Sequence, residues 1–382
     1  MPRVLVVQYS NPAAYPPVEH AALLLAEAGF EVELRGLRRL DEITIARHER
    51  IRMQLKPPAP GGWRQKAAFV RFVSWIRHEA AQIRPDWIYA SDPLSTPAAW
   101  SAGAGRSVRC IYHEHDAPGS DAGSTAMRIV LAARRRVAER ATICIAPSDG
   151  RAKRLSAETG RADVAVVWNV PLRREVAPLK RGPRAGGGTR LLYHGSIVPA
   201  RVPDTLLRAL ARLPRTVSCC ITGYDPAGGA YQEHLRALAA ELKLTDRVEF
   251  TGPIGTRQEL MERCAEFDVG LSLLPLNPTD FNEQTMLGAS NKPFDYLAAG
   301  LALLVPDRGD WHRTFVEPGY GVSCDPASVA SLEAAIRWLH ENPESRVRMG
   351  AAGRERILTE WNYETAFAPV LETMLGTAGA QA

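Results

Sequence analysis

The chain has 382 residues, of which 46% are hydrophobic and 23% charged, as in a globular protein large enough for two domains. No apolar run reaches the roughly 18–20 residues that a membrane-spanning helix needs, and the first residues show no signal-peptide pattern. The six cysteines show no C-x-x-C spacing. We therefore expect a cytoplasmic protein with buried free thiols and no metal cluster.

The net charge of +5 is unevenly distributed along the chain. Residues 1–180 carry 27 Lys and Arg against 18 Asp and Glu, a balance of +9, whereas residues 181–382 carry 20 against 24, a balance of −4. A basic first half indicates an anionic partner there, such as a membrane surface or a charged acceptor. Because no nucleic-acid-binding motif accompanies the charge, nucleic acid is not an expected partner.

The first half of the chain has the pattern of an α/β domain. Its first segments, at 4–8, 21–29 and 31–34, have the patterns of a strand, a helix and a strand. The residues before this helix are rich in proline and lack the G-x-G-x-x-G pattern, which excludes a dinucleotide-binding fingerprint. Further short apolar runs, each followed by polar residues, predict a parallel sheet with helices on both faces. These runs are 87–90, 109–112, 142–146 and 164–167.

A basic amphipathic helix is predicted within residues 63–77. Its apolar side chains Phe69, Phe72, Val73 and Ile76 share one helical face, and its arginines and lysine lie largely off that face. Such a helix can lie in a membrane interface. The pattern favours the other interpretation, in which the helix faces the core of an α/β domain and its cationic side is solvated. A second basic helix over 127–140 has the same two interpretations.

The organisation of the chain changes at residues 171–188. This segment has no apolar periodicity and is rich in Pro, Gly and Arg, which indicates a linker. The alternation of strands and helices then begins again. Two such domains would place a cleft between them, with strand ends facing it. We therefore predict a first domain over 1–172, a linker over 173–188, a second domain over 189–358 and a tail over 359–382.

Residues 290–306 combine a short helix with a buried strand. Ser290 or Asn291 can cap the helix, and the apolar run that follows it ends at a proline. Free amides at the start of a helix, next to Lys292, suit a phosphate, and Asp295 could hold a ribose hydroxyl. Taken alone, the same stretch fits a surface helix with a Lys292–Asp295 pair equally well.

Five segments of the second half occur in the order seen in group 1 glycosyltransferases, and the chain resembles that family. The segments are 193–201, 221–223, 248–253, 267–275 and 291–300. The family comprises the retaining GT-B enzymes of glycosyltransferase family 4. The resemblance covers residues 189–375 well and the first half loosely. It implies an α/β GT-B fold of two Rossmann-like β/α/β domains, an interdomain cleft and a C-terminal helix that crosses back to the first domain.

The resemblance implies a nucleotide-sugar site in the second domain. Arg201 corresponds to a basic residue that binds the donor diphosphate, a role that suits a guanidinium because it can bind two oxygens. Asn291 and Lys292 are implied to add diphosphate contacts. Gly195 and Ser196 are implied to let the backbone approach the same phosphates.

The base and ribose positions follow from the same resemblance. Thr251, Pro253 and Ile254 are implied to lie along the nucleobase. Asp295 stands where the family usually has a glutamate that binds the ribose. The first glutamate of the family's E-x7-E motif is missing, because Leu287 occupies its position.

In the first domain, residues 112–116 resemble the family's strand-end "HD" element. His115 matches the histidine that hydrogen-bonds the donor sugar near the reacting centre, although a capped loop explains the same residues. Glu19, His20 and Asp116 are the acceptor-binding candidates.

The resemblance thus implies transfer of a hexose from a nucleotide-diphosphate sugar to a hydroxyl acceptor, with retention and with His115, Arg201 and Lys292 as catalytic residues. The acceptor classes are a glycan, a lipid-linked saccharide or a small molecule. No D-x-D element is present, so we expect neither a metal nor a cofactor. Peripheral contact with the inner face of the membrane would follow if the basic helices faced lipid.

Two alternatives remain open at this point. One is a GT-B-fold sugar-nucleotide epimerase, which would use the same donor site but would need additional acid and base carboxylates. The other is a catalytically silent GT-B protein that acts as a binding or regulatory partner, suggested by the missing glutamate.

Overall fold

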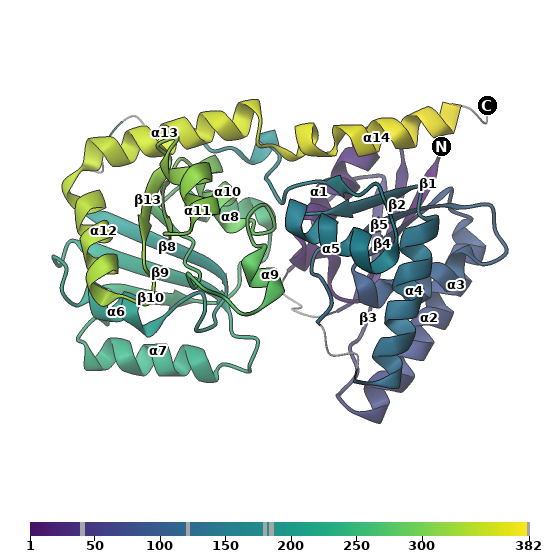
Figure 1. Cartoon of the computed structure of the whole chain (residues 1–382), viewed down its shortest axis with the longest axis horizontal. Helices are drawn as coiled ribbons and strands as arrows, with labels where there is room; N and C mark the ends of the chain where they lie inside the picture. The colour runs from purple at the N-terminus through teal and green to yellow at the C-terminus, as the bar shows by residue number, and fades with distance from the viewer. Residues whose placement is uncertain (39–42, 120–122, 179–181, 183–186, 380–382) are drawn as a thin grey trace. The chain divides into compact units, whose positions relative to one another are not determined.

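The structure, a computed structural model, describes residues 1–38, 43–119, 123–178, 182 and 187–379. The chain divides into two compact units. Unit 1 comprises Met1–Asn169 and Tyr363–Ala382, and unit 2 comprises Val170–Asn362. Each unit is built around its own parallel sheet (Figure 1). The last helix belongs to unit 1 although it follows unit 2 in the sequence, as the family resemblance implied.

Unit 1 contains a seven-stranded sheet in the order β3-β2-β1-β4-β5-β6-β7, in which all neighbours are parallel. Strand β1 lies inside the sheet between β2 and β4, and its residues 4–8 are all buried. Both faces of such a sheet are covered, which explains the continuous apolar runs in the sequence. The strands are β1 (Arg3–Gln8), β2 (Glu31–Leu37), β3 (Ile51–Lys56), β4 (Trp87–Ser91), β5 (Arg109–His113), β6 (Ile143–Ala146) and β7 (Ala165–Val166).

The edge strand β3 was not predicted. Its side chains alternate between half-buried and exposed, and its sequence is partly basic, so it carries a weak apolar signal. The helices of unit 1 are α1 (Pro16–Glu27), α2 (Trp63–Ile83), α3 (Thr96–Gly103), α4 (Thr125–Arg140), α5 (Asp149–Thr159) and α14 (Tyr363–Gly379), with short 3-10 turns η1 (Pro12–Ala14) and η2 (Pro93–Ser95). Helix α1 starts five residues earlier than predicted, because prolines fit the first turn of a helix.

Helix α2 faces the core of unit 1, which confirms the interpretation that its pattern favoured. Phe72, Ile76 and Ala80 are buried in the hydrophobic core. Two apolar side chains nevertheless remain outside it, since Trp63 is 74% exposed and Val70 is 64% exposed.

Unit 2 contains a six-stranded parallel sheet in the order β10-β9-β8-β11-β12-β13 (Figure 1). The edge strand β13 was not predicted, whereas the others lie within a few residues of their expected positions. The strands are β8 (Thr189–Ser196), β9 (Val217–Tyr224), β10 (Val248–Thr251), β11 (Val269–Leu271), β12 (Ala302–Pro306) and β13 (Gly321–Cys324).

The helices of unit 2 cover both faces of this sheet. They are α6 (Asp204–Leu210), α7 (Ala230–Glu241), α8 (Arg257–Cys264), α9 (Phe281–Gln284), α10 (Lys292–Ala298), α11 (Gly309–Trp311), α12 (Val329–Glu341) and α13 (Pro343–Thr359), with a 3-10 turn η3 (Arg173–Glu175) and a π-helical turn η4 (His312–Val316). Helix α10 is the helix predicted within 290–300, and Asn291 precedes its first residue. Its Tyr296 packs against Gly270 of β11, where any Cβ would overlap the tyrosine ring.

The segment predicted as a linker begins as an ordered part of unit 2. Residues 173–175 form η3, and the N–H of Ala177 donates to the carbonyl of Ala298 at 3.0 Å. Arg354 of α13 donates to the carbonyl of Ala177 at 2.6 Å. Residues 179–181 and 183–186 of the predicted linker lie outside the described residues. Among the described residues, no helix combines the length and apolarity needed to span a bilayer.

Candidate functional site

The end of β8 carries a glycine and a lysine in very close approach. Gly195 has a φ of +114°, and a Cβ on it would lie 2.9 Å from Cε and 3.1 Å from Nζ of Lys292. The lysine is the first residue of α10, and its Nζ lies 5.6 Å from the centre of the Tyr193 ring. Only a glycine leaves room for the lysine to cross this strand end.

The Lys292 ammonium lies in an environment that disfavours its charge. Burial first and the positive charge of Arg201 second lower the pKa of Lys292 to about 7, and Asp295 offsets only part of their effect. Within the described ranges, no carboxylate forms an ion pair with either Lys292 or Arg201. Two neighbouring cations without a neutralising carboxylate make a site that gains most from binding an anion.

Asp295 lies in the interior of unit 2, directly behind this site. Its side chain is fully buried, and the guanidinium of Arg257 donates to both of its oxygens, with 2.8 Å between Nη1 and Oδ2. Nε2 of His194 lies 3.3 Å from the same Oδ2. Burial alone would raise the pKa of Asp295, but the Arg257 charge outweighs it and holds this pKa below its ordinary value. Asp295 is therefore an ionised carboxylate.

Arg257 also binds a second carboxylate. Its Nε and Nη2 donate to Oε1 and Oε2 of Glu175, each at 3.1 Å, so that one buried guanidinium joins the turn η3 to helix α10. The sequence analysis missed Arg257 and Glu175, because both lie outside the matched segments. It also missed His194, which lies within segment 193–201 but was given no role there. The ribose contact expected of Asp295 stays a prediction, since the structure gives this carboxylate other partners.

The predicted nucleobase segment begins at Thr251, the last residue of β10. Thr251, Pro253 and Ile254 line a surface cavity of about 430 Å³ together with charged side chains of α8. The carbonyl of Gly252 accepts from the Thr222 hydroxyl at 2.9 Å, which ties this loop to β9. Ser196 ends β8, and its carbonyl accepts from the Tyr193 hydroxyl at 2.5 Å.

In unit 1, the candidate histidine follows β5 and is held by β4. Nε2 of His115 lies 3.0 Å from the hydroxyl of Ser91, and the centre of its ring lies 5.4 Å from the centre of the Tyr15 ring. Burial lowers the pKa of His115 to about 4, so the imidazole is neutral near pH 7. His113 is fully buried, and its Nδ1 lies 2.6 Å from the Tyr89 hydroxyl.

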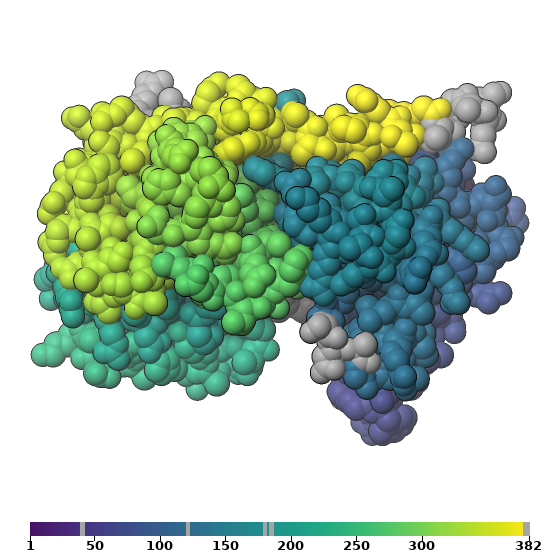
Figure 2. All heavy atoms as spheres, in the orientation of Figure 1, coloured from purple at the N-terminus to yellow at the C-terminus, as the bar shows by residue number. Residues whose placement is uncertain are grey.

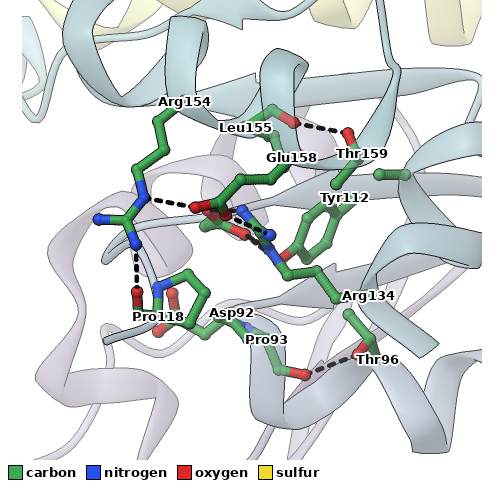
Figure 3. A network of polar contacts seen from close by, with 12 residues as sticks. Asp92, Pro93, Thr96, Tyr112, Pro118, Arg134, Arg154, Leu155, Glu158 and Thr159 are labelled. Carbon is green, nitrogen blue, oxygen red and sulfur yellow. Dashed lines mark hydrogen bonds and ion pairs between the residues drawn. The ribbon is translucent and has the colours of Figure 1, made fainter. Parts of the chain in front are cut away.

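A buried network supports the loop that carries His115 (Figure 3). Both oxygens of Glu114 accept from the guanidinium of Arg134, whose Nη1 donates to Glu158 at 2.7 Å. The Tyr112 hydroxyl donates to Glu114 as well. Arg154 of α5 donates to the carbonyl of Pro118 at 2.8 Å. These contacts from α4 and α5 fix the first part of the loop, at Glu114 and Pro118.

The acceptor candidates divide into one exposed and two buried residues. The Asp116 side chain is 65% exposed and lies 2.9 Å from Arg151 Nη1. Glu19 is buried and accepts from the N–H of Ala46 at 2.8 Å. His20 is fully buried against the Tyr363 ring of α14. Glu19 and His20 are thus held by contacts within unit 1, and their predicted contact with an acceptor stays a prediction.

No metal site is assigned. Across the part of the chain that the structure describes, His, Cys, Asp and Glu side chains form no group of three that could hold a metal ion. The absence of a metal and of a cofactor from the reaction stays a prediction.

Two parallel-sheet α/β units, one with a cationic strand end and one with a histidine at a strand end, define a two-domain protein of the GT-B class. The model for "Glycosyl transferase 4-like domain" matches residues 16–171, and that for "Glycosyl transferases group 1" matches residues 180–356. The chain belongs to the group 1 glycosyltransferases.

A curated relative and two solved structures place this match in context. The chain is 29% identical over 208 residues to the GDP-mannose-dependent alpha-(1-6)-phosphatidylinositol monomannoside mannosyltransferase of Mycobacterium tuberculosis, covering 54% of this chain and 52% of that protein. The match thus spans about half the length of this relative. The sucrose-phosphate synthase of Thermosynechococcus elongatus has a TM-score of 0.74 at 18% identity and full coverage of both chains. The Anabaena protein HepE in complex with UDP-glucose has a TM-score of 0.72 at 16% identity, covering 98% and 99% of the two chains. At these identities the two structures establish the fold alone.

Proposed function

We propose that the protein is a retaining hexosyltransferase that moves a hexose from a nucleotide-diphosphate sugar to a hydroxyl acceptor. The observation that carries this proposal is the pair of cations, Lys292 and Arg201, beside Gly195 at the end of β8. Asp295 does not neutralise the pair, because its oxygens are directed to Arg257 and His194. A diphosphate supplies the missing negative charge.

The same groups favour the departure of the nucleotide diphosphate. Negative charge grows on the leaving oxygens as the bond from the sugar to the diphosphate breaks. Lys292 and Arg201 are preorganised to stabilise that charge, which lowers the barrier in the way that fixed cations and dipoles do in enzymes generally. His115 supplies a neutral imidazole for a hydroxyl of the donor sugar. Retention at the anomeric carbon is proposed from the family alone.

The comparisons suggest which donors and acceptors to try first. The mycobacterial relative is named for GDP-mannose and for phosphatidylinositol monomannoside, and the Anabaena structure contains UDP-glucose. GDP-mannose and UDP-glucose therefore head the donor panel. A saccharide on a lipid carrier heads the acceptor panel.

A lipid-linked acceptor would bring unit 1 to a membrane surface, and its exposed apolar side chains support such contact. Trp63 and Val70 on α2 are mostly exposed, as is Ile129 on α4 at 58%. Exposed arginines lie on both helices. In Figure 2 the first turns of α2, in purple, lie at the lower edge of unit 1. Apolar side chains among cations suit the interface of an anionic bilayer.

The donor assignment can be tested by binding. Isothermal titration calorimetry with GDP-mannose, UDP-glucose and the corresponding ADP and TDP sugars should find at least one ligand. The Arg201→Ala substitution should lower the affinity for that ligand by about 10-fold or more. Arg208→Ala, at an exposed position of α6, is the matched control and should leave the affinity unchanged. Equal affinity of the Arg201→Ala variant and the wild type would overturn the assignment.

The same assay distinguishes the alternative functions. Product formation that requires an acceptor supports the transferase. Conversion of the donor sugar to its epimer without an acceptor would instead assign an epimerase. If no nucleotide sugar binds at all, the protein is a silent member of the fold.

A further inference from the structure

Asp92, the residue that follows β4, has an unusual main-chain conformation. Its φ is +67° and its ψ is 159°. Residues with a Cβ rarely adopt this region, and glycine is the residue that does so without strain. The strain is tolerated where the surrounding structure holds the residue in place, and such places concentrate at functional sites. An aspartate here indicates that its side chain is needed.

The side chain of Asp92 connects three strand ends of unit 1. Oδ1 accepts from the main-chain N–H of His115 at 2.8 Å and from that of Asp116 at 3.3 Å. Oδ2 accepts from Nε2 of Gln8, the last residue of β1, at 3.4 Å. The N–H of Asp92 donates to the carbonyl of His113 at 2.9 Å. Asp92 thus fixes the main chain of the loop that begins after β5.

The preceding residue fixes the histidine ring. The Ser91 hydroxyl lies 3.0 Å from Nε2 of His115, and among the described residues Nδ1 of the same ring has no hydrogen-bond partner. Two consecutive residues therefore hold His115. Ser91, the last residue of β4, contacts the histidine ring, and Asp92, the next residue, binds the main-chain N–H of the histidine. Only Nδ1 remains for a ligand, so the orientation of Nδ1 depends on both contacts.

We propose that Asp92 is a positioning residue for sugar transfer, which acts by fixing the main chain of His115 so that Nδ1 is presented to a hydroxyl of the donor sugar. This inference rests on the proposed function. The role requires an oxygen that accepts from two N–H groups, and it does not require a negative charge. An asparagine at position 92 can supply that oxygen, whereas a glycine or an alanine cannot.

Three substitutions separate the strain from the carboxylate. Asp92→Gly removes the carboxylate and also relieves the strain at positive φ, so it should fold at least as well as Asp92→Ala. We expect both variants to lose about 10- to 100-fold in kcat, because displacement of a reacting group by about 1 Å has an effect of this order. The KM for the donor should stay near the wild-type value, because the cations proposed to bind the diphosphate belong to unit 2. Asp92→Asn should restore kcat to within a few-fold of wild type.

Asp86 provides the matched control. It precedes the other end of β4, where Oδ2 accepts from the main-chain N–H of Arg3 at 2.7 Å. Asp86→Ala therefore removes an equivalent contact between a carboxylate and an amide, far along the strand from His115, and should leave kcat unchanged. A wild-type kcat in Asp92→Gly, or an equal loss in Asp92→Asn and Asp92→Ala, would overturn the proposal.

A second measurement does not depend on transferase activity. The pKa of His115 can be followed by NMR after assignment with a His115→Gln variant. The titratable and charged groups that face its ring or its main chain are Tyr15 before α1, His113 on β5, Asp92, the adjacent Asp116 and Arg151 on α5. We expect the His115 pKa to rise toward the ordinary value in Asp92→Gly, because the loop opens to water, and to stay low in Asp92→Asn.

An unchanged His115 pKa in Asp92→Gly would overturn the positioning role, even in a protein without transferase activity. If the wild type binds no nucleotide sugar but the pKa moves as expected, the proposed function fails and the positioning of His115 stands.

Discussion

Gly195 and Lys292 come from segments almost a hundred residues apart, yet only the missing side chain of the glycine lets the lysine lie over the end of β8. A Cβ on Gly195 would come within 2.9 Å of the lysine Cε. The backbone of this glycine is also in a region that other residues rarely adopt, at a φ of +114°. The position of the ammonium therefore depends on a residue that carries no functional group.

Gly195→Ala should weaken donor binding more than it weakens the fold. The new methyl group displaces Lys292, and the positive φ adds about 1–3 kcal/mol of strain. We expect donor affinity to fall about 10-fold or more in titration calorimetry. Gly376→Ala on α14 is the control, since a Cβ there meets no atom within 4 Å. Donor affinity equal to that of wild type in Gly195→Ala would show that the lysine is not held by this contact.

Lys292→Met should stabilise the protein while abolishing donor binding. The folded-state pKa of Lys292, about 7, lies below the ordinary value, so the unfolded state binds more protons between about pH 7 and pH 10 and wild-type stability rises with pH in that window. The gain from the methionine should therefore be largest at or below about pH 7, at about 1–2 kcal/mol, and should shrink toward about pH 9.

Urea unfolding at several pH values measures this difference, and Lys153→Met, at an exposed position of α5, should show no such trend. A gain that grows as the pH rises would contradict the assigned environment of Lys292. In the wild type, donor affinity should fall from about pH 7 to pH 9, because the ammonium that binds the diphosphate loses its proton.

Arg257→Met should be among the most destabilising changes in unit 2. It leaves Asp295 and Glu175 as buried carboxylates without their cation, at a cost of about 3–5 kcal/mol in the free energy of unfolding. The double variant Arg257→Met/Asp295→Asn should lose less free energy of unfolding than the two single variants lose together, because the two residues interact directly. Chemical denaturation of the four proteins gives the coupling energy.

Arg263→Met on the same helix is the control for this cycle. Its ion pairs with Glu249 and Glu266 lie at the surface, so Arg263→Met should lower the free energy of unfolding by less than about 1 kcal/mol. Equal losses at Arg257 and Arg263 would mean that the buried network contributes no more than a surface pair.

Replacement of Trp63 and Val70 by Ser should reduce binding to anionic vesicles. Both side chains are exposed beside the cations of α2, so their removal takes apolar area from the interface and leaves the core residue Phe72 untouched. Co-sedimentation with vesicles of phosphatidylglycerol and phosphatidylcholine measures the effect, and vesicles of phosphatidylcholine alone control for charge. Trp338→Ser, which removes an exposed tryptophan from unit 2, should have no effect. Absence of wild-type binding to either vesicle would exclude the proposed membrane contact.

The sequence by itself determined the two α/β units, most of the strands and the family, because apolar runs and helical periodicity are local properties of the chain. It failed at the edge strands β3 and β13, which have weak apolar signals, and it took the ordered residues 173–177 for part of a linker. The motifs also singled out Arg201 and Lys292 as candidates for the donor site, since each lies within a matched segment.

The tertiary structure alone decided what surrounds those residues. No pattern of spacing connects Asp295 to Arg257, or Asp92 to the main chain of His115, because each pair meets only when parallel strands bring distant segments to one edge of a sheet. The clearance between Gly195 and Lys292 has the same origin. Charges and hydrogen bonds act over a few ångströms, so the chemistry of this protein depends on distances that the order of residues does not specify.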